Sequence, residues 1–334
     1  MITVEFEKPD CVDNLQSFAD ILKARMTGNS FTIPSSTGEG YAWAEILPCG
    51  MSVMVFNGTI KEDYSIFRHN TFSQHFILQF SVVVPPKEEG FKRRRLPENA
   101  LVQSSVTLND SLKPLEIFVP EYTKISSVKF AFTKEDLSCL LNENAVNDLI
   151  NVHFPLLIKN DTLEPIDRTY RVMLDDLFSA DKEHPLRINF IQNRILLLLE
   201  KFILKLYSKK DSVSGRRNKD DEVSRLMQIE TLLVKDFSVA PPTIGELSKI
   251  SAMSPTKLKN DFKTTYGLPI YEYYQKNRML KAKSLLLDGQ YSIKEVGMLV
   301  GYSNLSHFAN TFKKEFGILP SELTSKDGML VYNL

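Results

Sequence analysis

The chain has 334 residues, and its 41 Lys and Arg are balanced by 41 Asp and Glu. This length predicts two domains with room for a small third, and the neutral balance excludes a strong overall field that would by itself indicate a charged partner. The first ten residues, MITVEFEKPD, are acidic and lack an apolar core, and the longest strongly apolar run, Ile195–Leu199, is too short to span a bilayer. We therefore expect a cytoplasmic protein without a signal peptide or membrane segment. Three scattered cysteines, Cys11, Cys49 and Cys139, predict neither a disulfide framework nor a zinc site.

Residues 1–133 have the pattern of a β-rich domain. Short apolar or alternating runs are separated by Gly, Pro, Asn and charged residues, which favours an antiparallel sandwich or barrel. These runs are Tyr41–Leu47, Met51–Phe56, His75–Val84, Leu101–Leu108, Leu115–Val119 and Val128–Phe132. The basic stretch Phe91–Leu96, FKRRRL, follows Pro85–Pro86 and is interpreted as a solvated loop.

The pattern changes to helices at about residue 134. The expected helices are Glu135–Leu141, Val146–Val152, Pro165–Phe178 and Leu186–Tyr207. The last has one apolar stripe with spacings of three and four, and further apolar residues widen it. The stripe consists of Ile188, Ile191, Ile195, Leu198, Phe202 and Leu206, widened by Leu196, Leu197, Leu199 and Ile203. Two interpretations are equally open: all of this surface is core of its own chain, or one face packs on the β-rich domain and the other on a second subunit.

The segment Ser208–Asp221, SKKDSVSGRRNKDD, is polar and charged and lacks apolar periodicity, so we interpret it as a linker. The expected organisation is therefore a β-rich domain followed by helices (1–207, with the helices in 134–207), a linker (208–221), a helical domain (222–325) and a tail (326–334).

An internal repeat occupies the helical domain. Glu246–Ser248 aligns with Glu295–Gly297, and Met253–Ser254 aligns with Tyr302–Ser303. Further along, Leu258 aligns with Phe308, Phe262 with Phe312 and Gly267 with Gly317, so the offset grows from 49 to 50 residues and one residue is inserted before the second helix of the later copy. A repeat of this length that occurs twice indicates two copies of one supersecondary unit.

The local signals in each copy predict a helix, a tight turn and a second helix. Thr243–Glu246 and Ser292–Glu295 are both capping boxes, so each begins a helix. The turns follow at Ala252 and Gly301. Gly301 can adopt the left-handed conformation freely, whereas Ala252 would pay about 1 kcal/mol for it. The first copy's second helix begins with an N-cap serine and a proline, and small residues at Ser248 and Gly297 allow close helix packing, as in a helix-turn-helix.

The second helix of each copy leaves a set of polar residues exposed. In the first copy these are Thr256, Lys257, Lys259, Asn260 and Lys263, and in the second Leu305, Ser306, His307, Asn310, Lys313 and Lys314. Most of these side chains can donate hydrogen bonds to phosphates and base edges. Residues 222–325 contain 13 Lys and Arg against 10 Asp and Glu, a net charge of +3, which favours DNA as the partner.

Residues 243–323 resemble the DNA-binding domain of the AraC/XylS family of bacterial transcription regulators. The resemblance rests on MSPTKLKNDFKTTYG, on the connecting helix YEYYQKNRMLKAKSLLLDG with Arg278 and Ala282, and on GYSNLSHFANTFKKEFGILPSEL. It implies a regulator, expected to be an activator, that binds promoter DNA and contacts RNA polymerase. It also implies that each second helix enters one of two successive major grooves, about 34 Å apart.

The resemblance implies particular roles for the exposed residues. Base contacts are expected from Thr256, Lys259, Asn260, Leu305, Ser306, His307 and Asn310, and phosphate contacts from Ser254, Lys257, Lys263 and Lys313. Leu305 departs from the family pattern, in which a polar group is common at this position. Two alternatives stay open: Leu305 contacts a thymine methyl, or it contributes nothing specific.

Regulators of this family often carry a cupin-type β-barrel sensor followed by dimerising helices, and the β-then-helix order here is similar. The fold expected is therefore α+β, with a cupin-like barrel and a homodimer through Leu186–Tyr207. The stretches GYAWAEILPCGMSVMVFNGTI and HFILQF are also similar to siderophore-responsive regulators of the PchR type. A small-molecule effector would then bind inside the barrel. The candidate lining residues are Tyr41, Trp43, Met51, Met54, Phe56, Phe76 and Phe80. Each of them taken alone is also explained as an ordinary core residue.

Catalytic and metal chemistry have little support in the sequence. His69, His75 and His153 are too widely spaced to form a ligand set, and no phosphate loop, nucleophile motif or HExxH pattern occurs. We therefore expect no enzyme activity, cofactor or metal. The alternative function is a small-molecule-binding or enzymatic β-domain whose helical tail makes only protein contacts.

Overall fold

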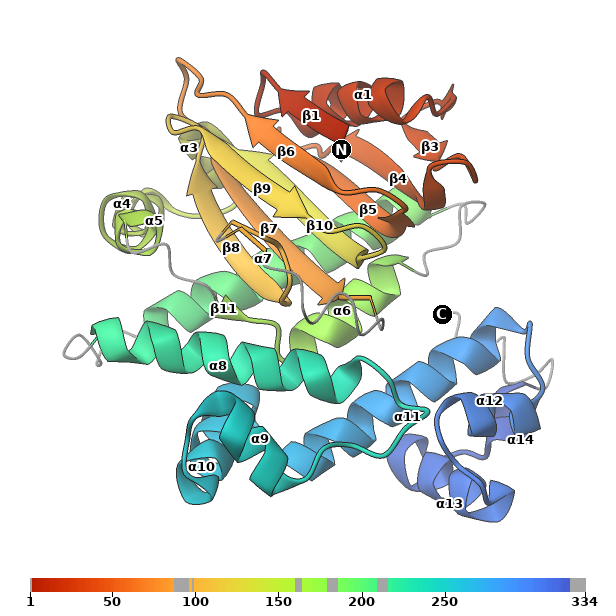
Figure 1. Ribbon diagram of the computed structural model, residues 1–334. Helices are drawn as coiled ribbons and strands as arrows, with labels where there is room; N and C mark the ends of the chain where they lie inside the picture. Colours follow the sequence, from red (N-terminus) through yellow and green to blue (C-terminus); the bar gives the residue numbers. More distant parts are fainter. Residues whose placement is uncertain are drawn as a thin grey trace. The chain divides into compact units, whose positions relative to one another are not determined.

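The computed structural model describes residues 2–86, 96–97, 99–159, 164–178, 186–208 and 216–324 (Figure 1). The chain divides into two compact units, Met1–Ser224 and Arg225–Leu334. The predicted basic loop Phe91–Leu96, apart from Leu96, lies outside the described residues, as does the tail 326–334.

An eight-stranded antiparallel sheet forms the centre of the first unit. Its strands, in spatial order, are β11 (Glu164–Pro165), β8 (Ser105–Asp110), β7 (Phe76–Val84), β10 (Lys124–Phe132), β5 (Ser52–Ile60), β4 (Gly38–Ile46), β3 (Ser30–Thr32) and β2 (Met26–Thr27). A smaller sheet has β6 (Tyr64–Arg68) at its centre, paired in parallel with β1 (Ile2–Phe6) and antiparallel with β9 (Leu115–Val119). Among the described strands, β11 and β2 stand at the two ends of the large sheet, so the predicted closed, cupin-like barrel is not confirmed.

Both faces of the large sheet are covered, because its central strands are apolar on both sides. In β5, Val53 and Val55 belong to one core, whereas Met54 and Phe56 belong to another. The first core is completed by the helices α6 (Arg168–Phe178) and α7 (Arg187–Ser208). The second lies between the large sheet and the layer made of the small sheet and α1 (Cys11–Leu22). This alternation follows from the two-residue period of a strand.

The remaining helices of this unit are short and lie between β10 and β11 in the sequence. They are α3 (Lys134–Ser138), α4 (Glu143–Asp148), the π-helical turn η1 (Leu149–His153) and α5 (Phe154–Lys159). The first two begin with capping side chains: the hydroxyl of Thr133 accepts from the backbone of Asp136, and Asn142 accepts from the backbone of Ala145. The change from strands to helices predicted near residue 134 is thus confirmed.

The residues proposed to line an effector pocket lie on both faces of the large sheet. Trp43 and Phe80 are buried in the core that contains α6 and α7, and Tyr41 packs against it. Met54 and Phe56 are buried in the other core, across the sheet. Because neighbouring residues of a strand point to opposite faces, this set could not converge on one site. These side chains are therefore divided between two cores, and their assignment to an effector site stays a prediction.

The apolar stripe of α7 is part of its own chain's core. Ile191, Ile195, Leu198, Phe202 and Leu206 are all buried there. Two leucines seven residues apart, Leu197 and Leu204, are instead 40% and 60% exposed.

The second unit consists of helices. They are α8 (Arg216–Val234, in this unit from Arg225 onward), α9 (Ile244–Ser251), α10 (Pro255–Tyr266), α11 (Ile270–Asp288), α12 (Ile293–Leu299), α13 (Leu305–Phe316) and α14 (Pro320–Leu323). Helix α8 begins inside the segment predicted as a linker, of which 209–215 lie outside the described residues. The hydrophobic periodicity of the sequence did not predict the start of this helix, because charged residues such as Arg, Lys and Glu favour a helix without forming an apolar stripe.

Helix α11 connects two small cores. Its first half contributes Ile270, Tyr273 and Tyr274 to a core shared with α8, α9 and α10. Its second half contributes Met279, Ala282 and Leu286 to a core shared with α12, α13 and α14. A buried hydrogen bond of 2.8 Å from the Tyr273 hydroxyl to Glu230 fastens α8 to the first half. The two copies of the repeat are thus built on opposite ends of one 19-residue helix.

Candidate nucleic-acid interface

Each copy of the repeat forms a helix-turn-helix, as predicted. In the first helix of each copy, the capping box has both of its hydrogen bonds. The carboxylate of Glu246 accepts from the backbone N–H of Thr243 at 2.7 Å, and Glu295 accepts from Ser292 at the same distance. These backbone hydrogen bonds, which favour the charged form, lower the pKa of both glutamates below the ordinary value.

The turns are equivalent in backbone conformation but not in residue type. Ala252 has a φ of 51° and Gly301 a φ of 75°, so both are left-handed. The alanine therefore keeps the strained conformation, at a cost of about 1–2 kcal/mol. The inserted residue of the second copy follows the turn: Ser254 caps α10, whereas its counterpart in sequence, Ser303, is followed by Asn304, which caps α13. From these caps onward the helices run in register with an offset of 50 residues.

The inward faces of α10 and α13 are aromatic. Phe262 of α10 is fully buried, and its ring lies 5.4 Å from that of Tyr273 on α11, centroid to centroid. Phe308 and Phe312 of α13 are fully buried in the same way, with Phe308 against Tyr302. A Cβ on Gly297 would lie 3.4 Å from Leu305 and 3.5 Å from Phe308, which is ordinary van der Waals contact, so α12 and α13 already pack closely at this position. The burial of one face determines which face of each helix remains in solvent.

The outward faces carry the same polar ridge twice. On α10, Thr256, Asn260 and Lys263 are exposed at i, i+4 and i+7. On α13, the residues 50 positions later, Ser306, Asn310 and Lys313, are exposed at the same spacing. Each ridge therefore presents a hydroxyl near the helix N-terminus, then a carboxamide, then an ammonium group. The other predicted contact residues, Ser254, Lys257, Lys259, Leu305 and His307, are exposed as well.

The two helices differ beside their ridges. On α10, Lys259 stands one residue before the ridge asparagine, and Lys257 forms a 3.0 Å ion pair with Asp261. On α13, the corresponding positions are Ala309 and His307. The ring of His307 packs against that of Tyr302 in a T-shaped arrangement, with the ring centroids 5.4 Å apart.

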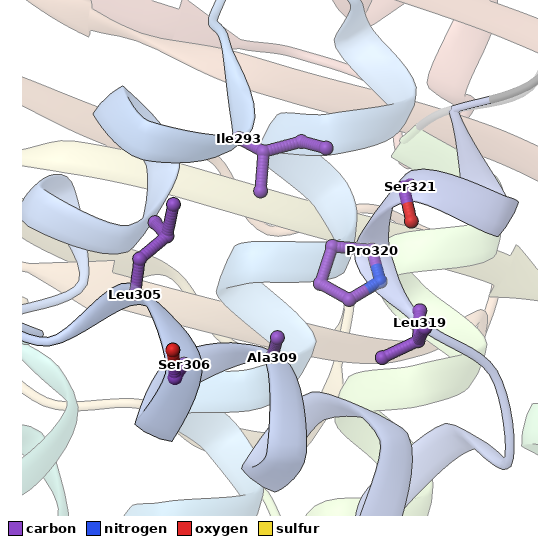
Figure 2. Close-up of a pocket in the computed structure, with 7 residues that line it drawn as sticks. All are labelled: Ile293, Leu305, Ser306, Ala309, Leu319, Pro320 and Ser321. Atoms are coloured by element: carbon purple, nitrogen blue, oxygen red, sulfur yellow. The ribbon is translucent and has the colours of Figure 1, made fainter.

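A depression lies on either side of the α13 ridge. One is a groove of about 720 Å³ between α11 and α13, lined by polar and charged residues that include Lys276, His307 and Lys314. The other is a smaller, mainly apolar pocket of about 240 Å³ on the opposite flank, formed by α12, the start of α13 and α14 (Figure 2). The surface around α13 is therefore polar on one flank and apolar on the other.

Residues 247–326 match a family model described as a helix-turn-helix domain. The virulence regulon transcriptional activator VirF of Yersinia enterocolitica is 35% identical over 79 residues, which are 24% of this chain and 29% of VirF. The transcriptional activator RhaS of Yersinia pestis is 29% identical over 107 residues, 32% of this chain and 39% of RhaS. A solved structure of a probable AraC family transcriptional regulator from Rhodopseudomonas palustris is 26% identical, with a TM-score of 0.28, over 31% of this chain and 97% of that one.

Residues 247–326 are an AraC-type helix-turn-helix domain. This confirms the family resemblance of the C-terminal unit. The chain spans less than half the length of VirF and of RhaS.

Arg278 of the AraC-type domain has a structural role that residue patterns alone did not indicate. Its guanidinium donates to the carbonyl oxygens of Val300 and Gly301, at 2.5 and 2.6 Å, and lies 3.9 Å from the centroid of the Tyr302 ring. Arg278 therefore fastens the turn of the second helix-turn-helix to α11. Only the family resemblance drew attention to this position, because a lone arginine within a helix carries no local signal of a partner 23 residues away.

Within the described part of the chain, no helix is long and apolar enough to cross a membrane. The same residues contain no group of three or more His, Cys, Asp or Glu side chains arranged to hold a metal ion.

Proposed function

We propose that this protein is a sequence-specific DNA-binding transcription regulator that inserts α10 and α13 into successive major grooves. The observation that carries the proposal is the repeated outward ridge: Thr256, Asn260 and Lys263 on one helix and Ser306, Asn310 and Lys313 on the other. Carboxamides pair with the N6 and N7 atoms of adenine, hydroxyls pair with several base edges, and lysines contact phosphates. Each ridge thus carries two groups suited to bases and one suited to the backbone.

The spacing of the two ridges supports the same proposal. Helix α11 has 19 residues, and an α-helix of that length is about 28 Å long. Helix α10 packs on its first half and α13 on its second, so the ridges are separated by a distance comparable to one turn of B-DNA, about 34 Å. The hydrogen bonds of Arg278 hold the second copy of the repeat in place on α11.

The assignment of single residues follows from their positions on the helices. Thr256, Lys259 and Asn260 would contact bases from α10, and Leu305, Ser306, His307 and Asn310 would do so from α13. Ser254 and Lys257 at the start of α10, together with Lys263 and Lys313 farther along the two helices, would contact phosphates. Lys257 would first leave its ion pair with Asp261, which costs little because both side chains remain partly exposed.

We further propose that the first unit controls this activity and that the regulator is an activator that contacts RNA polymerase. The similar proteins VirF and RhaS are transcriptional activators. In this proposal, the first unit is a cupin-like sensor that binds a small-molecule effector. Dimerisation through α7 is supported by the exposure of Leu197 and Leu204 on the side opposite its buried stripe. Two leucines seven residues apart form the beginning of a helix–helix seam.

Selection of binding sites by the intact protein tests the proposal. Fragments of genomic DNA captured at about 0.1 M salt should share a motif of two half-sites separated by about one helical turn. The Asn260→Ala plus Asn310→Ala double variant should enrich a weaker motif that has lost its preference at the two positions contacted by the carboxamides. Recovery of the same random fragments by the wild type and the double variant would contradict sequence-specific binding.

A further inference from the structure

The two recognition helices present different chemistry beside the same polar ridge. On α10, the ridge is flanked by Pro255 and by the charged Lys259. On α13, the corresponding positions are Leu305 and Ala309, and Leu305 is 45% exposed. An exposed leucine at the start of a recognition helix is not needed for the core, which Phe308 and Phe312 fill.

Leu305 forms one wall of the apolar pocket introduced above (Figure 2). Ile293 of α12 lies across from it, and Leu319 and Pro320, at the start of α14, lie on a third side. Ser306 and Ala309 complete the side that belongs to α13, and no charged side chain lines the pocket. The volume of about 240 Å³ is enough for one or two methyl groups but too small for a folded segment of another protein.

The pocket is continuous with the ridge that we assign to base contacts. Ser306 belongs to both, and Asn310 follows Ala309 directly on the helix. In the major groove, the apolar group among the base edges is the C5 methyl of thymine, which lies on the same edge of an A·T pair as the adenine N6 and N7 atoms. A carboxamide on adenine and an apolar pocket beside it therefore suit A·T pairs together.

We propose that this pocket accepts thymine methyl groups, with Leu305 as a specificity-determining residue, so that α13 selects an A·T-rich half-site by apolar contact. This inference rests on the proposed function and deepens it. Helix α10, which has Lys259 where α13 has Ala309, selects its half-site by hydrogen bonds and charge. The two half-sites of one target therefore differ in how they depend on methyl groups.

Replacing thymine by uracil tests this inference, because it removes the C5 methyl and leaves the Watson–Crick pairing unchanged. In the site that the intact protein selects, thymines are replaced by uracil in the α13 half-site alone or in the α10 half-site alone. We expect about fourfold weaker binding for each methyl that is lost from the pocket, and no change for the α10 half-site. Which half-site belongs to which helix is established with the Asn260→Ala and Asn310→Ala variants.

The Leu305→Ala variant completes the test as a double-mutant cycle. It should bind the thymine and uracil duplexes equally, whereas Leu299→Ala, which truncates another exposed leucine of the same motif, should keep the wild-type ratio. Equal binding of both duplexes by the wild type, or an unchanged ratio in Leu305→Ala, would overturn the inference while the DNA-binding function stands. If the intact protein selects no site, the proposed function fails, and this inference fails with it.

Discussion

At the two turns of the repeat, reciprocal exchanges of glycine and alanine should have opposite effects on the stability of the domain. Gly301 and Ala252 occupy equivalent left-handed positions, and Gly301 lies in a confined space. A Cβ built on Gly301 would be 2.3 Å from the carbonyl oxygen of Phe237 and 3.0 Å from the guanidinium of Arg278. We predict that Gly301→Ala strongly destabilises the AraC-type domain.

The magnitude follows from three contributions. The left-handed conformation of an alanine costs about 1–2 kcal/mol, and the loss of unfolded-state entropy returns about 0.4–1 kcal/mol. The contact with Phe237 is with backbone, which cannot rotate away, and overpacking of this kind costs about 1–3 kcal/mol. Gly301→Ala should therefore destabilise the domain by about 1–5 kcal/mol. Ala252→Gly removes the strain but makes the unfolded chain more flexible, so it should stabilise the domain by about 0–1.6 kcal/mol.

The single tryptophan of the chain makes the measurement specific to one unit. Trp43 is buried in the first unit, so its fluorescence in urea follows that unit alone. Hydrogen exchange of peptides from α12 and α13, measured by mass spectrometry in the intact chain, follows the second. Gly301→Ala should accelerate exchange in α12 and α13 and leave the Trp43 transition unchanged. Wild-type exchange rates in Gly301→Ala, or a destabilised Ala252→Gly, would refute the reasoning about this turn.

Three further predictions concern single contacts. Asn260→Ala and Asn310→Ala should each lose about 1–3 kcal/mol of discrimination at one base position, which titration against a panel of single-base variants of the site would measure. Lys263→Ala should weaken binding to all sequences and reduce the slope of log K against log salt by about 1, and an unchanged slope would exclude the phosphate contact. The lowered pKa values of Glu246 and Glu295 mean that their caps stabilise the domain above the ordinary glutamate pKa and lose this effect as the pH falls through the lowered values. The double replacement by glutamine should therefore flatten the loss of stability below about pH 5, as followed by hydrogen exchange of α9 and α12.

The helix-turn-helix repeat could be predicted from the sequence because its determinants are local. Capping boxes, the left-handed turn position and the alternation of aromatic and polar residues each act within a few positions along the chain. The contacts of the turn with distant parts of the chain could not be predicted from the sequence. The close approach of Phe237 to Gly301 and the hydrogen bonds of Arg278 join segments that only the tertiary fold brings together.

The first unit was predicted less completely, for two physical reasons. Its strands are apolar on both faces, so a run such as Ser52–Ile60 indicates a buried strand but not which neighbour each face contacts. This is why Trp43 and Met54 were assigned to one pocket although they lie across the sheet from each other. Helix α1 was overlooked inside a β-rich region, although Asp10 caps it and apolar residues recur along it at spacings of three and four.

The spacing between half-sites tests the central claim most directly. Once a target is known, affinity is measured for duplexes in which 5 or 10 base pairs are inserted between the half-sites. Because one continuous helix holds α10 and α13 at a constant separation, both insertions should reduce binding to that of a single half-site. Affinity that does not change with either insertion would show that the two helices do not bind the same duplex together.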